Sequence, residues 1–153
     1  MAAVLFAPLL LVGDTGAAMS QDRGYVVFDP SLTAKILQQC SRSTPKPGEA
    51  GWTPSDLDIA KLEAKLPAAL ALARPDLASR KWLEGAPARW LRQYVGIVRG
   101  GHRFIYGNFV PDLERMRIVW RQQPQGTCDG GADFFGAEYD VEKGMFSHLA
   151  FNG

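Results

Sequence analysis

The 153-residue chain has few of the side chains on which most enzyme chemistry depends, with only two histidines and two cysteines. No serine stands in the G-x-S-x-G context of a hydrolase nucleophile, and neither a P-loop nor a G-x-G-x-x-G motif is present. These absences leave little equipment for acid–base or nucleophilic catalysis. A catalytic pair of Cys40 with His102 or His148 would need a free thiol, which a disulfide would remove.

Metal ligands are equally sparse. Neither cysteine has a second ligand at C-x-x-C or C-x-x-H spacing. Asp129 and Asp133 in the stretch DGGAD supply too few oxygens for a calcium loop, and a tight turn explains the glycines equally well. We therefore predict no catalytic residue, no metal site and no cofactor.

Long apolar runs are also missing, since Ala2–Val12 is too short to span a bilayer. The run has the length of a signal-peptide core, and Gly16–Ala18 supplies small residues for cleavage before Met19. We predict a signal peptide over residues 1–18 and one domain over 19–153, periplasmic or secreted, with no stable membrane span after processing. No Lys or Arg precedes the run, so a start upstream of Met1 or a buried N-terminal element remains an alternative.

Two cysteines in an exported protein most often pair. Cys40 ends a helix-like segment and Cys128 lies in a glycine-rich loop. We predict a disulfide between them, which would tie the segment before the main helix to a loop late in the chain.

Net charge is small at +1, which gives no overall attraction to nucleic acid or membrane. The balance hides an asymmetry, because residues 80–121 carry a net +6 and residues 122–153 a net −4. Five arginines of the basic stretch are candidates for a partner-binding surface: Arg92, Arg103, Arg115, Arg117 and Arg121. The alternative is a solvated strand face whose charges keep the sheet edge soluble.

The clearest predicted element is a helix over Thr53–Ala73, with Thr53 as its cap and Pro54 at the first helical position. Apolar residues recur at spacings of three and four and form one stripe: Ile59, Leu62, Leu66, Ala69 and Leu70. Pro67 lies inside this pattern and predicts a kink or an end near Leu66.

From Trp90 onward the apolar period changes to two, which indicates strands. Gly100-Gly101 predicts a two-residue hairpin turn. Pairing the arms about it gathers six residues on one face: Leu91, Val95, Ile97, Phe104, Tyr106 and Val110. We expect this face to pack on the helix, and the opposite face, with Tyr94, Ile105 and Phe109 beside the arginines, to meet solvent.

Further strands are predicted at Met116–Trp120, Phe135–Tyr139 and Ser147–Phe151, the last two joined by a turn that ends at Gly144. This order of elements predicts an α+β fold. One main helix would pack on a four- to five-stranded antiparallel meander, a layout that resembles the cystatin-like folds by analogy.

Three stretches together resemble a group of small exported bacterial proteins of unassigned activity. They are Gln39-Cys40-Ser41-Arg42, Trp52-Thr53-Pro54-Ser55 and the ending CDGGADFFGAEYDVEKGMFSHLAFNG. The resemblance implies export and transfers no site residue.

The function favoured by these observations is an exported, non-enzymatic binding module, for example an inhibitor or immunity-like protein. Its partner would be another exported protein or an anionic surface, and nucleic acid is not expected. The alternative is a small ligand-binding protein or hydrolase that uses a cavity between helix and sheet.

Overall fold

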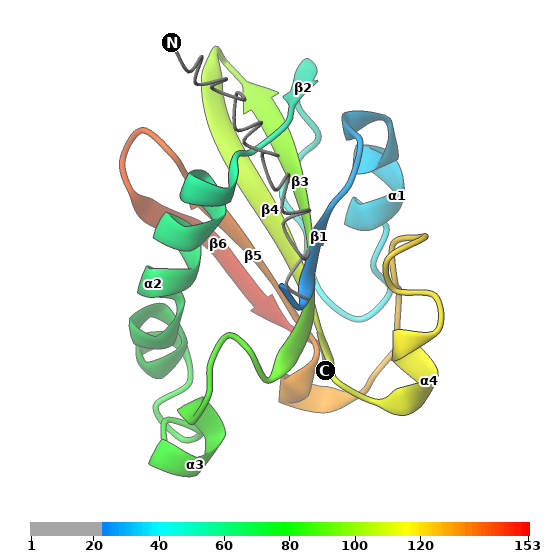
Figure 1. Cartoon of the computed structure of the whole chain (residues 1–153). Coiled ribbons are helices and arrows are strands. Elements are labelled where there is room, and N and C mark those ends of the chain that lie inside the picture. Colours follow the sequence, from blue (N-terminus) through cyan, green and yellow to red (C-terminus); the bar gives the residue numbers. More distant parts are fainter. Residues whose placement is uncertain (1–22) are drawn as a thin grey trace, which may run out of the picture.

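The computed structural model describes residues 23–153, so the predicted signal peptide lies outside the described residues. Over these described residues the fold is α+β, with one open, mixed sheet of six strands and few helices. The helix α2 (Asp56–Ala73) lies on one side of the sheet, whereas α1 (Thr33–Leu37) and α4 (Glu114–Arg117) lie on the other (Figure 1). Three short elements complete it: η1 (Pro30–Leu32), α3 (Arg80–Leu83) and η2 (Gly131–Asp133).

The strand order is β1-β3-β4-β5-β6, and β2 also pairs with β3. The strands are β1 (Tyr25–Val27), β2 (Ala50–Trp52), β3 (Trp90–Arg99), β4 (His102–Pro111), β5 (Phe135–Asp140) and β6 (Met145–Phe151). Because β1 runs parallel to β3, the prediction of a purely antiparallel meander is wrong. A parallel pair needs a long crossover connection, and the chain between β1 and β3 provides one. No local sequence pattern predicts such a pairing.

The β3–β4 hairpin forms in the predicted register. Ile97 lies opposite Phe104, and Val95 lies opposite Tyr106. Gly100 and Gly101 have φ values of +59° and +76°, as a two-residue hairpin turn requires. The pairing predicted from the apolar alternation is therefore confirmed.

The predicted assignment of the two faces is wrong. The stripe of α2 packs on the face that carries Tyr94, Ile105 and Phe109. The opposite face, with Val95 and Tyr106, packs on residues before and within α1 instead. Since both faces are apolar and both are covered, alternation alone could not choose between them.

The strand predicted at Met116–Trp120 is also wrong. Residues 113–120 form helical turns that include α4, in which the Trp120 N–H donates to the Met116 carbonyl. Met116 and Trp120 are four residues apart, so they share a helical face as readily as a strand face. The position beside β4 is taken by β5, and Ile118 is left 71% exposed.

Cys40 and Cys128 form the predicted disulfide, with their Cα atoms 5.2 Å apart. The bridge joins the loop after α1 to the loop before η2, where Ser41 Oγ also accepts from the Asp129 N–H. A closed loop of 88 residues corresponds to about 4–5 kcal/mol in the chain-entropy treatment of the unfolded state.

The helix α2 begins at Ser55 rather than at the predicted cap, Thr53. Ser55 Oγ accepts from the Asp58 N–H at 3.3 Å, and the Asp58 carboxylate accepts from the Ser55 N–H at 3.0 Å. This reciprocal pair is a capping box. The helix continues through Pro67 to Ala73, so the alternative of an end near Leu66 is wrong.

We expect Ser55→Ala to lower the free energy of unfolding by about 1 kcal/mol, because it removes the side-chain acceptor of the cap. Thr53→Ala is the matched control. Thr53 is exposed and precedes the cap, so its replacement should change stability by less than about 0.5 kcal/mol. Urea denaturation measures both, and an equal or larger loss for Thr53→Ala would contradict the observed helix start.

Candidate functional site

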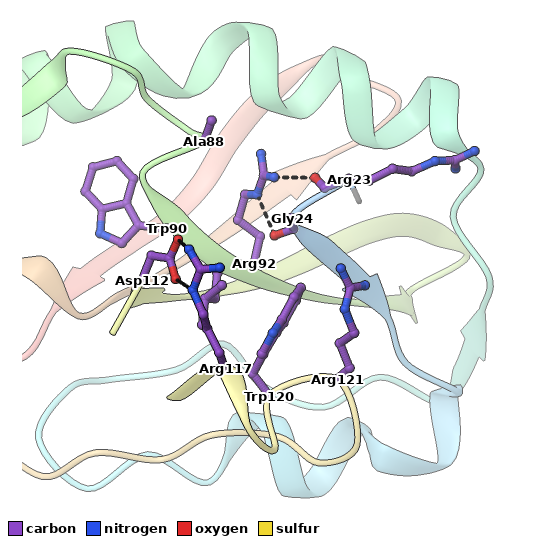
Figure 2. Close-up of a pocket in the computed structure, with 10 residues that line it drawn as sticks. Arg23, Gly24, Ala88, Trp90, Arg92, Asp112, Arg117, Trp120 and Arg121 are labelled. Carbon is purple, nitrogen blue, oxygen red and sulfur yellow. Dashed lines mark hydrogen bonds and ion pairs between the residues drawn. The ribbon is translucent and has the colours of Figure 1, made fainter. Parts of the chain in front are cut away.

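The five arginines predicted to form one basic surface occupy three separate places. Arg103 on β4 forms an ion pair with Glu142 and lies 5.0 Å from the centre of the Trp52 ring. Arg115 is exposed on α4. Only Arg92, Arg117 and Arg121 come together, around one recess (Figure 2). The prediction of a single basic sheet face is therefore wrong.

The recess has a volume of about 450 Å³. It lies where the start of β3 meets the chain before β1 and the segment from the end of β4 through α4. Its lining holds four arginines and one aspartate: Arg23, Arg92, Arg117, Arg121 and Asp112. Three of these arginines form ion pairs, Arg23 with Asp56, Arg92 with Glu63 and Arg117 with Asp112. With Arg121, the group keeps a small excess of positive charge, which favours an anionic group over a cationic one.

Arg92 forms a wall of the recess and is 5% exposed. Residue 92 shares a face with Tyr94, so its side chain points toward α2, where it pairs with Glu63 at 3.2 Å. Its guanidinium also donates to the carbonyls of Gly24, at 3.1 Å, and Arg23. Arg92 therefore shapes the recess and fixes the chain before β1.

Arg117 and Arg121 are exposed at the recess, and both are held by neighbours. Arg117 donates through two nitrogens to the two oxygens of Asp112, in the fork geometry that arginine offers carboxylates. The Arg121 guanidinium lies 4.2 Å from the centre of the Trp120 ring and donates to the Tyr25 carbonyl at 3.2 Å. Figure 2 shows Trp120 between these two arginines.

A partly buried network connects the recess to α2. The Tyr94 hydroxyl donates to Glu63 Oε1 at 2.9 Å, and Arg92 pairs with the same oxygen. Burial raises the pKa of Glu63, although the Arg92 charge and the Tyr94 hydrogen bond oppose this shift. Burial also raises the pKa of Tyr94, which stays a neutral donor.

Sequence reasoning missed Arg23, Asp112 and Glu63 as parts of this site. Arg23 reaches the recess through the parallel pairing of β1 with β3. Asp112 reaches it because the chain after β4 turns into α4 instead of a strand. Neither event leaves a local signal in the sequence.

The other sequence candidates lie elsewhere. Both cysteines are in the disulfide, and His148 contacts the Ser43 carbonyl at 3.0 Å. Between α2 and the sheet, large buried side chains such as Leu66, Tyr94 and Phe109 fill the interior. Within residues 23–153 no three His, Cys, Asp or Glu side chains gather as a metal ion would need. In that same part of the chain, no helix has the length and apolar character needed to cross a membrane.

Comparison with known proteins found no matching family model, no matching curated protein and no matching solved structure. The resemblance to small exported bacterial proteins stays a prediction from the sequence.

Glu63→Gln should remove a specific pH dependence of stability. Because the folded-state pKa of Glu63 lies above its ordinary value of 4.5, the folded protein holds this proton more tightly than the unfolded chain. The stability of the parent relative to Glu63→Gln should therefore fall as the pH rises above 4.5 and through the raised folded-state pKa of Glu63. Denaturant titrations at several pH values measure the difference.

Asp58→Asn provides the control with opposite sign. The hydrogen bond from Ser55 lowers the pKa of Asp58 below its ordinary value of 3.8. The parent should therefore gain stability relative to this variant as the pH rises through that value. Parallel trends for the two variants would contradict a raised pKa of the partly buried Glu63 carboxyl.

Proposed function

We propose that this protein is an exported, non-enzymatic binding protein that captures an oxyanion-bearing partner in its arginine-lined recess. The observation that carries the proposal is the gathering of four arginines around one recess with a single carboxylate. Planar guanidinium groups match carboxylate and phosphate oxygens in both geometry and charge.

The chemistry of the recess favours a carboxylate on an apolar stem. Trp120 and Leu91 supply apolar walls beside the guanidinium groups of Arg117 and Arg121. Arginine and tryptophan are among the residues enriched at the positions that dominate binding energy in protein interfaces. A volume of about 450 Å³ admits a side chain or a small organic acid. An aspartate or glutamate presented by another exported protein meets both requirements.

Export is supported by the covalent structure. Disulfides such as Cys40–Cys128 persist in oxidising compartments and are rare in the cytosol. The predicted signal peptide over residues 1–18 points to the same location, periplasmic or secreted. An inhibitor or immunity-like protein is one form that such a binding module would take.

The test is binding of poly-L-glutamate, with citrate as the free-acid probe and poly-L-lysine as the charge control. The protein should bind poly-L-glutamate and not poly-L-lysine, and added salt should weaken the binding. We expect the double variant Arg117→Glu/Arg121→Glu to bind poly-L-glutamate at least about tenfold more weakly.

Arg115→Glu is the matched control, because Arg115 is exposed on the same short helix and does not line the recess. The affinity of the Arg115→Glu variant for poly-L-glutamate should stay within about twofold of the parent value, because Arg115 lies outside the recess. The single variant Arg121→Glu changes the charge by the same amount, so equal losses for Arg115→Glu and Arg121→Glu would show that only net charge matters. Binding of citrate alone would assign the recess to a free organic acid instead of a protein partner.

A further inference from the structure

The strand β6 lies at an open edge of the sheet. It pairs with β5, and within residues 23–153 no strand adjoins its other side (Figure 1). A strand edge presents backbone N–H and C=O groups that another strand can pair with. The seven residues of Met145–Phe151 include no proline, lysine or carboxylate, the residues with which proteins usually protect such an edge.

A groove of about 580 Å³ runs beside this edge, between β6 and α2. Apolar side chains form most of its walls: Ala64, Ala68 and Leu72 from α2, and Met145, Phe146 and Leu149 from the strand. Leu72 is 86% exposed and Met145 is 56% exposed, so large apolar groups border the groove in solvent. Because Phe146 and Leu149 also pack on the core, the strand wall of the groove is held in place.

Among the residues that the structure describes, Lys65 is the one charged group that lines the groove, and no carboxylate lines it. The Lys65 ammonium donates to the Gly144 carbonyl, immediately before β6. An ammonium has three donors, so this bond positions the charge without using all of its hydrogen-bonding capacity. The groove is therefore complementary to an apolar occupant that carries a negative charge near the start of β6.

We propose that β6 and this groove bind an extended segment of another protein, which adds to the sheet as a new edge strand. Alternate side chains of the segment, which are apolar, enter the groove toward α2, and a carboxylate on the segment pairs with Lys65. Addition of a strand uses the backbone groups of β6 for affinity and the groove for side-chain selection.

A second copy of this chain fits the site less well. Its own edge strand, MFSHLAF, has no carboxylate to place against Lys65. If two copies paired through β6, neither copy would place a negative charge beside Lys65 of the other. The groove is also distinct from the arginine-lined recess, whose lining shares no residue with it.

The test uses two seven-residue peptides that alternate valine and threonine, one with a glutamate at its N-terminal end and the other with a glutamate at its C-terminal end. Both have capped termini and a fluorescent label. We expect one of the two peptides to bind the protein measurably, as followed by fluorescence anisotropy. N-methylation of one alternate set of peptide amides should abolish binding, whereas methylation of the other set should leave it unchanged, because only one set faces β6.

Variants of the protein test the groove directly. Ala68→Trp fills it from an exposed helix position, and Lys65→Glu reverses its charge; each should weaken binding by at least about tenfold. Lys61→Glu is the control, since Lys61 is exposed one turn earlier on α2 and does not line the groove. Circular dichroism establishes that each variant is folded.

Three results would overturn the proposal. One is the absence of binding by either orientation of the peptide to the parent protein. Another is equal binding by both N-methylated peptides, which would mean that the strand edge is not used. The third is a concentration-dependent dimer that Ala68→Trp abolishes while no peptide binds, which would assign the groove to a second copy.

Discussion

The pairing of β3 with β4 fixes where most of the other elements lie. The strand β3 also pairs with β1 and β2, and β4 also pairs with β5, so these three strands take their positions from the hairpin. A slip of one residue would exchange the two faces of a strand. It would turn Gln93, in place of Tyr94, toward the aromatic and aliphatic side chains between the sheet and α2. Such a slip would bury a polar amide among apolar groups, which is costly without a partner.

On their own face, Gln93 and Asn108 have those partners. Asn108 Nδ2 donates to Gln93 Oε1 at 2.8 Å, and Gln93 Nε2 donates to the Gln123 carbonyl at 2.9 Å. Arg42 joins the same network by donating to Asn108 and Asn152. The loop before Cys128 thus covers this part of the sheet largely through hydrogen bonds, and the disulfide holds it there. Register, polar network and disulfide support one another.

The parts of this fold that the sequence predicted are those with local causes. The Gly100-Gly101 turn and the alternation beside it specify the hairpin without reference to the rest of the chain. The disulfide followed from there being only two cysteines. The parallel β1, by contrast, depends on a crossover of many residues. The choice of face was undetermined because Tyr94 and Val95 are both fully buried, on opposite sides.

The candidate site shows the same division. Local charge density drew attention to Arg92, Arg117 and Arg121, and these three do meet. The predicted reason for their meeting, a common strand face, was wrong because residues 113–120 are helical. Asp112 gives a physical reason for the turn at this point, since it accepts both hydrogen bonds from Arg117 across the first residues of α4.

Covering both faces of the sheet also determines where binding surfaces remain. The α2 face is occupied by the aromatic core, and the other face by α1, its flanking loops and the polar network. What is left is the periphery: the recess where β1 and β3 begin, and the free side of β6. At the recess, the cations are fixed before any ligand arrives, Arg92 by Glu63 and Arg117 by Asp112. Binding there would immobilise few additional side chains, so less of the interaction energy would be lost to ordering. The largely buried Arg92–Glu63 pair is therefore better explained as an interaction that holds the recess in shape than as a source of stability, since desolvation offsets most of the attraction in such pairs.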